Sequence, residues 1–535
     1  MLKELNLTSL EPAWPQATAA AAVIILALIL IRHLDYEKTV NVPVVGPAAG
    51  FTKWIAAVRN VWAARDSIHQ GYSKYSRSAF QIPTMTRMDV FLCDRAMTRE
   101  YYSLDDEHMS FQAAMSEEFQ FKYSLPGQQH DIRKIPNSVI GKALSWQKAR
   151  ANNPQDPFFA EFSKEFLHGF LQEMDTFRRN QKPSSGLSFF FSHPAEPSSE
   201  WMTVPCFPLA LKIVARLTTK SLFGEPLCRN DYFLDLCCQF ADAVPRVAMV
   251  LRCFPAFARP YVAKHLAGTK LVQKLRTFVL GEVTTRRSSR PKNPLKDLLD
   301  FVMNWADEQE YSWSDLEVSD MIINVVFAAL HTSSQLVTHT IFELATRPEY
   351  VPELREEIQQ CFEAHGEGSK AAVDAMYKVD SFIKETQRCN VLDASALARL
   401  VLKPYTFSNG LHVPQGTYIF TPNSPLLEDE RFYKDPGQFD GLRFARMRND
   451  VKLKASCPLT STSEHSMHFG IGRNACPGRF MVSDEVKLVM IHLLLNMELA
   501  MENFGPRPKN VAFGKFMLPD MKAKIWLKKA TPRVS

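Results

Sequence analysis

A single cysteine stands near the end of a glycine-rich run, Phe-Gly-Ile-Gly-Arg-Asn-Ala-Cys-Pro-Gly, over residues 469–478. Two glycines let the backbone turn tightly enough for its N–H groups to converge on one point, where the sulfur of Cys476 would be held as a thiolate. A helix beginning after Pro477 and Gly478 would add the positive end of its dipole. A thiolate presented in apolar surroundings is suited to bind a metal, and it indicates the iron of a haem.

A dinucleotide-binding loop is a weaker interpretation of the same run. Gly470, Gly472 and Ala475 satisfy the spacing G-x-G-x-x-A, but Pro477 and Gly478 fall where the helix of such a loop should already run. No short strand–helix–strand unit surrounds them, so this interpretation is disfavoured.

Two further interpretations concern the cysteine itself. His465, His468 and Cys476 would form a zinc site only with a fourth ligand at customary spacing, and the chain has no Cys-x-x-Cys pair. A buried structural cysteine is the common default, but it gives no reason for the aromatic residue, glycines and arginine around it.

The cysteine run resembles the haem-binding loop of cytochrome P-450 monooxygenases. The matching residues are Phe469, Gly470, Gly472, Arg473, Cys476 and Gly478. The resemblance implies a haem b cofactor whose iron is ligated by Cys476, with Phe469 and Arg473 beside the haem. Asn474 stands where histidine is frequent in that family, at a position that often varies.

A long helix is expected to begin near Ser314, with an apolar stretch over residues 321–330 that is interrupted only by Asn324. The polar groups after that stretch can hydrogen-bond the backbone and distort a helix locally, although an ordinary core helix ending in a polar surface is the commoner arrangement. By resemblance this is the family's helix over the haem, in which Thr332 manages protons during cleavage of dioxygen. His331 replaces the acidic residue that commonly precedes that threonine, and histidine can relay protons near neutral pH.

Glu385 and Arg388 are three positions apart and therefore share one face of a predicted helix. Such pairs are common on helix surfaces and alone indicate little. They match, however, the family's E-x-x-R element, and the run over residues 439–444 resembles the segment whose arginine completes a buried network. The resemblance thus implies that Glu385, Arg388 and Arg443 interact.

Between these elements, residues 400–420 have strand composition with turns at Asn409-Gly410 and Gln415-Gly416, which predicts a small hairpin sheet. By resemblance, Arg399 and Arg473 would each reach a haem propionate, because guanidinium binds carboxylate bidentately. A third propionate contact would come from a Trp-x-x-x-Arg helix. Two registers remain open for it, Trp146 with Arg150 and His130 with Lys134.

The N-terminal region carries a candidate membrane anchor. Residues 12–31 contain no charge, and residues 17–31 are apolar except for Thr18, a length that crosses a bilayer as a helix. A cleavable signal peptide is the alternative, but a basic region before the apolar run is missing. Arg32 and Lys38 follow the span, so the rest of the chain is expected in the cytosol.

Composition is consistent with one large catalytic domain. The 535 residues are 46% hydrophobic and 22% charged, and no glycine-serine linker divides them. The net charge of +6 is spread along the chain and does not indicate nucleic acid binding. The ten cysteines are irregularly spaced, which indicates reduced thiols and not a set of disulfides. The predicted fold is mainly α with small β-sheets: a cytochrome P-450 fold over residues 37–535, preceded by one transmembrane helix within residues 1–36.

The resemblance implies a monooxygenase that inserts one oxygen atom from O2 into an apolar small molecule. Electrons would come from NADPH through a separate reductase, with cytochrome b5 as a second candidate donor, at the endoplasmic reticulum membrane. Several segments resemble the fungal branch that includes ent-kaurene oxidase and other terpenoid-tailoring enzymes. Candidate substrate-lining stretches are residues 111–123 and 240–257.

Two alternatives remain open at this stage. The haem enzyme could instead carry out desaturation, epoxidation, rearrangement or several oxidations of a non-terpenoid lipid or polyketide. In the other class, the chain would be a membrane-tethered binding protein on a catalytically dead version of the fold, which the presence of Cys476, Thr332, Glu385 and Arg388 argues against.

Overall fold

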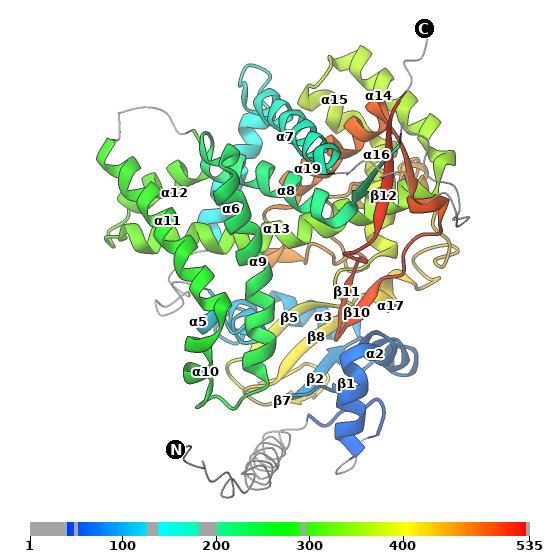
Figure 1. Ribbon diagram of the computed structural model, residues 1–535. Helices are drawn as coiled ribbons and strands as arrows, with labels where there is room; N and C mark the ends of the chain where they lie inside the picture. The colour runs from blue at the N-terminus through cyan, green and yellow to red at the C-terminus, as the bar shows by residue number, and fades with distance from the viewer. Residues whose placement is uncertain (1–39, 48–51, 126–136, 181–200, 290–295, 531–535) are drawn as a thin grey trace, which may run out of the picture.

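One helix of 32 residues, α13 (Asp315–Thr346), passes through the middle of the molecule (Figure 1). The computed structural model describes residues 40–47, 52–125, 137–180, 201–289 and 296–530. Ser314 caps the helix by accepting a hydrogen bond from the Glu317 N–H, while the Glu317 side chain accepts from the Ser314 N–H. This capping box satisfies backbone donors that would otherwise lack partners, so the start of α13 is firmly set.

The other helices surround α13 or border the main sheet. From the N-terminal side they are α2 (Thr52–Tyr75), α3 (Arg95–Ser103), α4 (Phe111–Glu118), α5 (Phe121–Ser124), α6 (Asn137–Ala151), α7 (Phe158–Asn180), α8 (Cys206–Phe223), α9 (Asp231–Arg252), α10 (Arg259–His265), α11 (Ala267–Ser289) and α12 (Leu298–Asp307). After α13 they are α14 (Val351–His365), α15 (Lys370–Ala375), α16 (Tyr377–Cys389), α17 (Ser424–Leu427), α18 (Arg443–Met447) and α19 (Arg479–Asn496).

The strands form small sheets. The largest has five strands in the order β1-β2-β8-β5-β3, in which β2 and β8 pair in parallel. Its strands are β1 (Ala79–Pro83), β2 (Met88–Leu92), β3 (Met109–Ser110), β5 (Ser395–Val401) and β8 (Tyr418–Pro422). A three-stranded sheet joins β4 (Met202–Pro205), β12 (Lys524–Lys529) and β9 (Met497–Met501), and two hairpins pair β6 (Tyr405–Thr406) with β7 (His412–Val413) and β10 (Val511–Phe513) with β11 (Phe516–Leu518).

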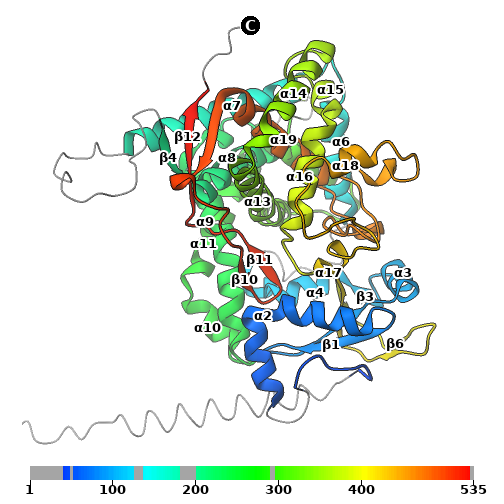
Figure 2. The ribbon, with the colours of Figure 1, turned by 90° about the vertical axis from the view of Figure 1, so that its right-hand side faces the viewer.

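The molecule has a sheet-containing region and a helical region. The five-stranded sheet and α2 lie at one end, and the helices around α13 fill the other, with the β10–β11 hairpin reaching from the C-terminal region toward α2 (Figure 2). The main core gathers buried side chains from α8, α9, α13, α16 and α19. Burial of this apolar surface is the principal force that holds the helices together.

The mainly helical fold with small sheets is confirmed, and so is the hairpin sheet expected near residues 400–420. The helix predicted from Ser314 is present and continues past the apolar stretch to Thr346. The predicted anchor, residues 17–31, lies outside the described residues. Among the described helices, α13 is long and apolar enough to cross a membrane, but 61% of its most apolar stretch is buried inside the molecule.

Candidate active site

The glycine-rich run folds into a tight loop that leads into α19. Gly470 and Gly472 have φ angles of +68° and +63°, the left-handed region that other residues rarely adopt. A Cβ atom at Gly470 would also lie 3.2 Å from the carbonyl oxygen of Asn474. The Cys476 N–H donates to the Phe469 carbonyl at 2.6 Å, which closes the loop before the helix begins at Arg479.

Burial and nearby hydrogen-bond donors act in opposite directions on the pKa of the Cys476 thiol. Burial raises the pKa of the thiol, whereas the N–H groups of Gly478 and Arg479 and the Arg479 guanidinium act to lower it. Arg479 is fixed in this role because its Nη1 donates to the Cys476 carbonyl at 2.7 Å. A metal cation bound to the sulfur would add the charge that holds the thiolate form.

Cys476 lies in the wall of a cavity of about 2350 Å³. The same wall includes His331 and Thr332 from α13 and Arg473 from the cysteine loop. Most of the other wall residues are apolar, among them Phe111, Met115, Phe119, Phe121, Leu144, Val325 and Phe327. The cavity therefore brings together the predicted metal ligand, the predicted proton-managing pair and an apolar chamber.

Thr332 faces this cavity from an unbroken turn of α13. Its hydroxyl donates to the Ala328 carbonyl at 2.9 Å, so the hydrogen of the hydroxyl is committed to the backbone. The oxygen lone pairs remain available to accept a hydrogen bond from the cavity.

His331 is held between two other helices. Its Nε2 lies 3.1 Å from Asp242 Oδ1 on α9, and its ring stacks on Phe207 of α8 at an interplanar angle of 7°. Although burial acts to raise it, contacts with His331 and Arg246 hold the pKa of Asp242 below its ordinary value. Asp242 falls within the predicted lining stretch 240–257, but its contact with His331 was not predicted, because the two residues lie on helices far apart in the chain.

Arg399 and Arg473 lie in different environments. Arg399 is 3% exposed, between the rings of Tyr101 and Phe111, and its one hydrogen bond within the described part of the chain runs from Nη1 to the Ala398 carbonyl. A register shift between Ala396 and Arg399 in the pairing of β5 with β8 sets this direction. Arg473 is half-exposed at the cavity wall and donates to the Leu104 carbonyl at 2.6 Å.

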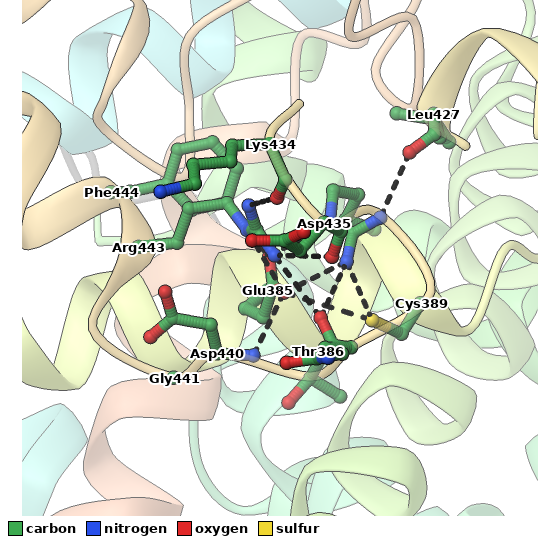
Figure 3. A network of polar contacts seen from close by, with 12 residues as sticks. Glu385, Thr386, Cys389, Leu427, Lys434, Asp435, Asp440, Gly441, Arg443 and Phe444 are labelled. Atoms are coloured by element: carbon green, nitrogen blue, oxygen red, sulfur yellow. Dashed lines mark hydrogen bonds and ion pairs between the residues drawn. The ribbon is translucent and has the colours of Figure 1, made fainter. Parts of the chain in front are cut away.

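Glu385, Arg388 and Arg443 form one buried network. Arg388 Nε and Nη2 donate to the two oxygens of the Glu385 carboxylate at 2.8 Å each, and Arg443 Nε lies 3.1 Å from both. Figure 3 shows Arg443 also donating to the carbonyls of Lys434 and Asp435, so the network ties α16 to the irregular segment that precedes the cysteine loop.

The literal Trp-x-x-x-Arg match does not reach the cavity. Trp146 packs on Phe301, and Arg150 pairs with Asp156 through Nε at 2.7 Å. Ile140 and Leu144 of the same helix line the cavity instead. The alternative register, His130 with Lys134, lies outside the described residues.

Both predicted lining stretches contribute to the cavity wall. Glu118 from the first stretch and Arg252 from the second form an ion pair at 3.0 Å between Oε1 and Nη1, and Arg87 Nη2 lies 2.7 Å from Glu118 Oε2. Burial acts to raise the pKa of Glu118, but the surrounding cations Arg252, Lys515 and Arg87 hold it well below its ordinary value. The mainly apolar wall is therefore polar and charge-paired at this place.

Asn324 is a wall residue whose role the sequence did not reveal. It is the sole polar position in the apolar stretch over residues 321–330, and in the described part of the molecule its buried Oδ1 has no hydrogen-bond partner. That break in an otherwise apolar pattern was a usable signal.

The residues of the alternative zinc site do not assemble. His465 stacks on Phe432 with ring centroids 3.9 Å apart, and among the described residues no three His, Cys, Asp or Glu side chains come together as a metal cluster.

A family model described as Cytochrome P-450 matches residues 197–527. This chain belongs to the cytochrome P-450 family. It is 66% identical over 527 residues to the cytochrome P-450 monooxygenase terQ of Tolypocladium album, covering 97% of this chain and 94% of that protein. It is also similar to ltmQ of Epichloe festucae var. lolii, with 59% identity over 97% and 98% of the two chains, and to atmQ of Aspergillus flavus, with 37% identity over 99% and 97%.

The predicted family, the oxidoreductase class and the haem cofactor are thereby confirmed. Cytochrome P-450 enzymes bind haem iron through a protein thiolate, generally receive electrons from a redox partner and act on apolar substrates. The described residues fit that cofactor, since the Cys476 sulfur meets converging N–H groups beside a cavity large enough for haem and substrate. Thiolate ligation also accounts for the glycine turns that the loop requires.

Proposed function

We propose that this cytochrome P-450 inserts one oxygen atom from O2 into a terpenoid in fungal secondary metabolism. The observation that carries the proposal is that Cys476 and Thr332 share the wall of one large, mainly apolar cavity. Bound haem supplies the activation of dioxygen, and the protein supplies the ligand, the protons and the exclusion of water. The high identity to fungal monooxygenases over nearly the whole chain supports the pathway type.

The predicted site residues take separate roles in this proposal. Cys476 holds the iron, Phe469 packs beside the ligating loop, and Arg399 and Arg473 bind the haem propionates. Buried Arg399 supports this role because a guanidinium with one internal hydrogen bond has donors left for a carboxylate. Thr332 and His331 manage protons at the cavity wall.

The residues of the Glu385 network support the chain segment that leads into the cysteine loop. Their contacts link α16 to the chain between Lys434 and Arg443, which runs toward the loop. Because this network is buried and multiply hydrogen-bonded, it suits a structural role and not contact with substrate.

The side chain of Asn324 indicates that the substrate carries a polar group. A buried amide oxygen that accepts no hydrogen bond costs about 1–3 kcal/mol unless a ligand donates to it. The preferred substrate is therefore a large apolar skeleton that carries one polar group, such as a hydroxyl, at the end remote from the carbon that is oxidised. The α-helical rise places Asn324 about 12 Å along α13 from Thr332, which suits a polycyclic molecule.

The proposal includes a location and partners. Residues 1–36 anchor the chain in the endoplasmic reticulum membrane, and residues 37–535 form the catalytic domain facing the cytosol. NADPH-cytochrome P-450 reductase delivers the electrons, with cytochrome b5 as an additional donor. The G-x-G-x-x-A spacing at residues 470–475 lacks the surrounding strand–helix–strand unit, so the chain is not expected to bind the nicotinamide itself.

The test measures binding and product separately. Diterpene hydrocarbons and their mono-alcohols are titrated into the holoenzyme while the haem spectrum is recorded, and bound compounds are then incubated with reductase, NADPH and 18O-labelled dioxygen. Oxidised product carrying one labelled oxygen atom is expected, with tighter binding of the alcohols. NADPH consumption without a labelled product from any bound terpenoid contradicts the proposed substrate class.

The role of Asn324 has its own comparison. Replacing Asn324 with leucine keeps the side-chain volume and removes the amide, so alcohol binding should weaken by about 10-fold while hydrocarbon binding stays the same or improves. Equal changes in the binding of alcohols and hydrocarbons would contradict a role of Asn324 in selecting the substrate.

A further inference from the structure

We propose that Asp242 is a positioning residue that holds the His331 imidazolium for proton transfer toward Thr332, across the gap between α9 and α13. The inference rests on the proposed function, because it concerns the proton supply of that same cavity. The contact of Asp242 with His331 was not expected from the sequence, and Asp242 touches neither the haem ligand nor Thr332 in the described contacts.

The first support is the geometry of His331. Asp242 Oδ1 lies 3.1 Å from His331 Nε2, within the range of a salt bridge. The contact therefore holds the ring on the side that faces α9. The parallel Phe207 ring on the α8 side limits rotation of the imidazole. Two helices thus fix the position of the imidazole at the cavity wall.

The second support is the hydrogen bonding of Thr332. Because its hydroxyl already donates to the Ala328 carbonyl, the oxygen at the cavity acts as an acceptor. A threonine in this state needs a neighbouring proton donor to pass a proton onward. His331 precedes it on α13, and both residues line the same cavity.

The third support is the charge state of Asp242. Its pKa lies below the ordinary value despite partial burial, so the carboxylate is ionised at neutral pH. Arg246, one turn along α9, lies 3.9 Å away and keeps the carboxylate charged without displacing it from His331. An ionised carboxylate can accept a hydrogen bond from the ring throughout a proton transfer.

The transfer balances within the cavity. The imidazolium gives up one N–H proton toward the water held at Thr332, and the neutral ring keeps the electron pair. Bulk water then returns a proton to the ring beside Asp242, whose side chain is 43% exposed. Asp242 remains a carboxylate throughout, so it acts on the position and charge of His331 without itself exchanging a proton.

The test uses dioxygen and needs no identified substrate. Holoenzyme in membranes with reductase and NADPH reduces dioxygen either to peroxide, with two electrons and two protons, or to water, with four of each. Proton supply governs this partition. NADPH and dioxygen consumed and peroxide formed are measured for the wild type, Asp242→Asn, Asp242→Glu, His331→Gln and the double variant Asp242→Asn with His331→Gln.

In Asp242→Asn, the ratio of water to peroxide should fall by about 10-fold, the effect of losing one charge-assisted contact. His331→Gln should show a similar fall, the double variant no further fall, and Asp242→Glu a partial recovery. Asp235→Asn removes the same charge from an exposed position two turns earlier on α9 and should leave the ratio unchanged.

Two further measurements distinguish a role of Asp242 in positioning His331 from a role in joining two helices. The midpoint of thermal unfolding and the haem spectrum of the reduced carbon monoxide complex are recorded for each variant. A lower midpoint with an unchanged water-to-peroxide ratio would mean that Asp242 merely joins two helices, and additive losses in the double variant would mean that the two residues act separately. Either result overturns the inference, as does a wild type that forms peroxide alone. A wild type that consumes no NADPH contradicts the proposed function instead.

Discussion

The Nε atom of Arg443 lies 3.1 Å from both oxygens of the Glu385 carboxylate, although 58 positions separate the two residues in the chain. Arg388 donates to the same carboxylate from the next turn of α16. One buried anion thus compensates two buried guanidinium groups, and its loss would leave both without a counter-charge.

Replacing Glu385 with glutamine should destabilise the protein by about 3–5 kcal/mol, because two buried cations would then lack compensation. Urea unfolding followed by fluorescence, together with haem content after purification, measures this effect. Arg446→Gln is the matched control, since Arg446 pairs with Asp440 at the surface and should cost less than about 1 kcal/mol. Equal effects of the two changes would contradict the structural role of the network.

Replacing Cys476 with serine should abolish the strongly red-shifted Soret band of the reduced carbon monoxide complex, because that band requires a thiolate on the iron. Monooxygenase turnover should disappear with it. Cys361→Ser, at a partly exposed cysteine of α14, should leave the band unchanged. A red-shifted band that survives in Cys476→Ser would place the ligand elsewhere.

Replacing Thr332 with valine keeps the branched shape and removes the acceptor oxygen. Product formed per NADPH consumed should fall by about 10-fold, with peroxide rising in proportion, while Thr332→Ser keeps most of the coupling. Spectral titration with the same ligand checks that binding is retained in each variant. Parallel losses of binding and coupling would instead indicate a packing role.

The buried carboxyl group of Glu485 is expected to make the protein less stable as the pH rises. Complete burial raises the pKa of its carboxyl group to about 8, against weaker opposing contacts with Thr218 and Ser333. Between the pKa values of the unfolded and folded states, the folded protein binds more protons, so stability should fall as pH rises from about 4.5 to about 8. In the variant Glu485→Gln this slope should be reduced, with a gain of roughly 2–4 kcal/mol near pH 8.

Urea midpoints across that pH range test the prediction. Glu363→Gln, on an exposed part of α14, is the control and should follow the wild-type curve. If Glu485→Gln also follows the wild-type curve, Glu485 is not held protonated in the folded state.

The parts of the site that sequence reasoning anticipated are those encoded by neighbouring residues. The turn before Cys476 needs two glycines within three positions, and Glu385 with Arg388 needs a single helix turn, so both leave a local pattern. Contacts that depend on how helices pack leave no such pattern. The meeting of Asp242 with His331 requires the packing of α9 against α13, which no short stretch of either helix specifies.

Arg399 illustrates the same limit within a sheet. Its position in β5 follows from strand composition, but the direction of its side chain depends on the register shift after Ala396 and on the positive φ of Leu397. The literal Trp-x-x-x-Arg match was misleading for a related reason, because Trp146 and Arg150 lie on the side of α6 that packs away from the cavity.

Asn324 and Thr332 lie on one continuous helix, α13, and both line the cavity. The distance between the polar group of a bound ligand and the carbon that is oxidised is therefore set by the helical rise and not by flexible loops. Moving the amide by one helical turn, to position 328, would shorten that span by about 6 Å. Regioselectivity in this enzyme should therefore change in steps along a bound skeleton, which offers a rational route to isomeric products.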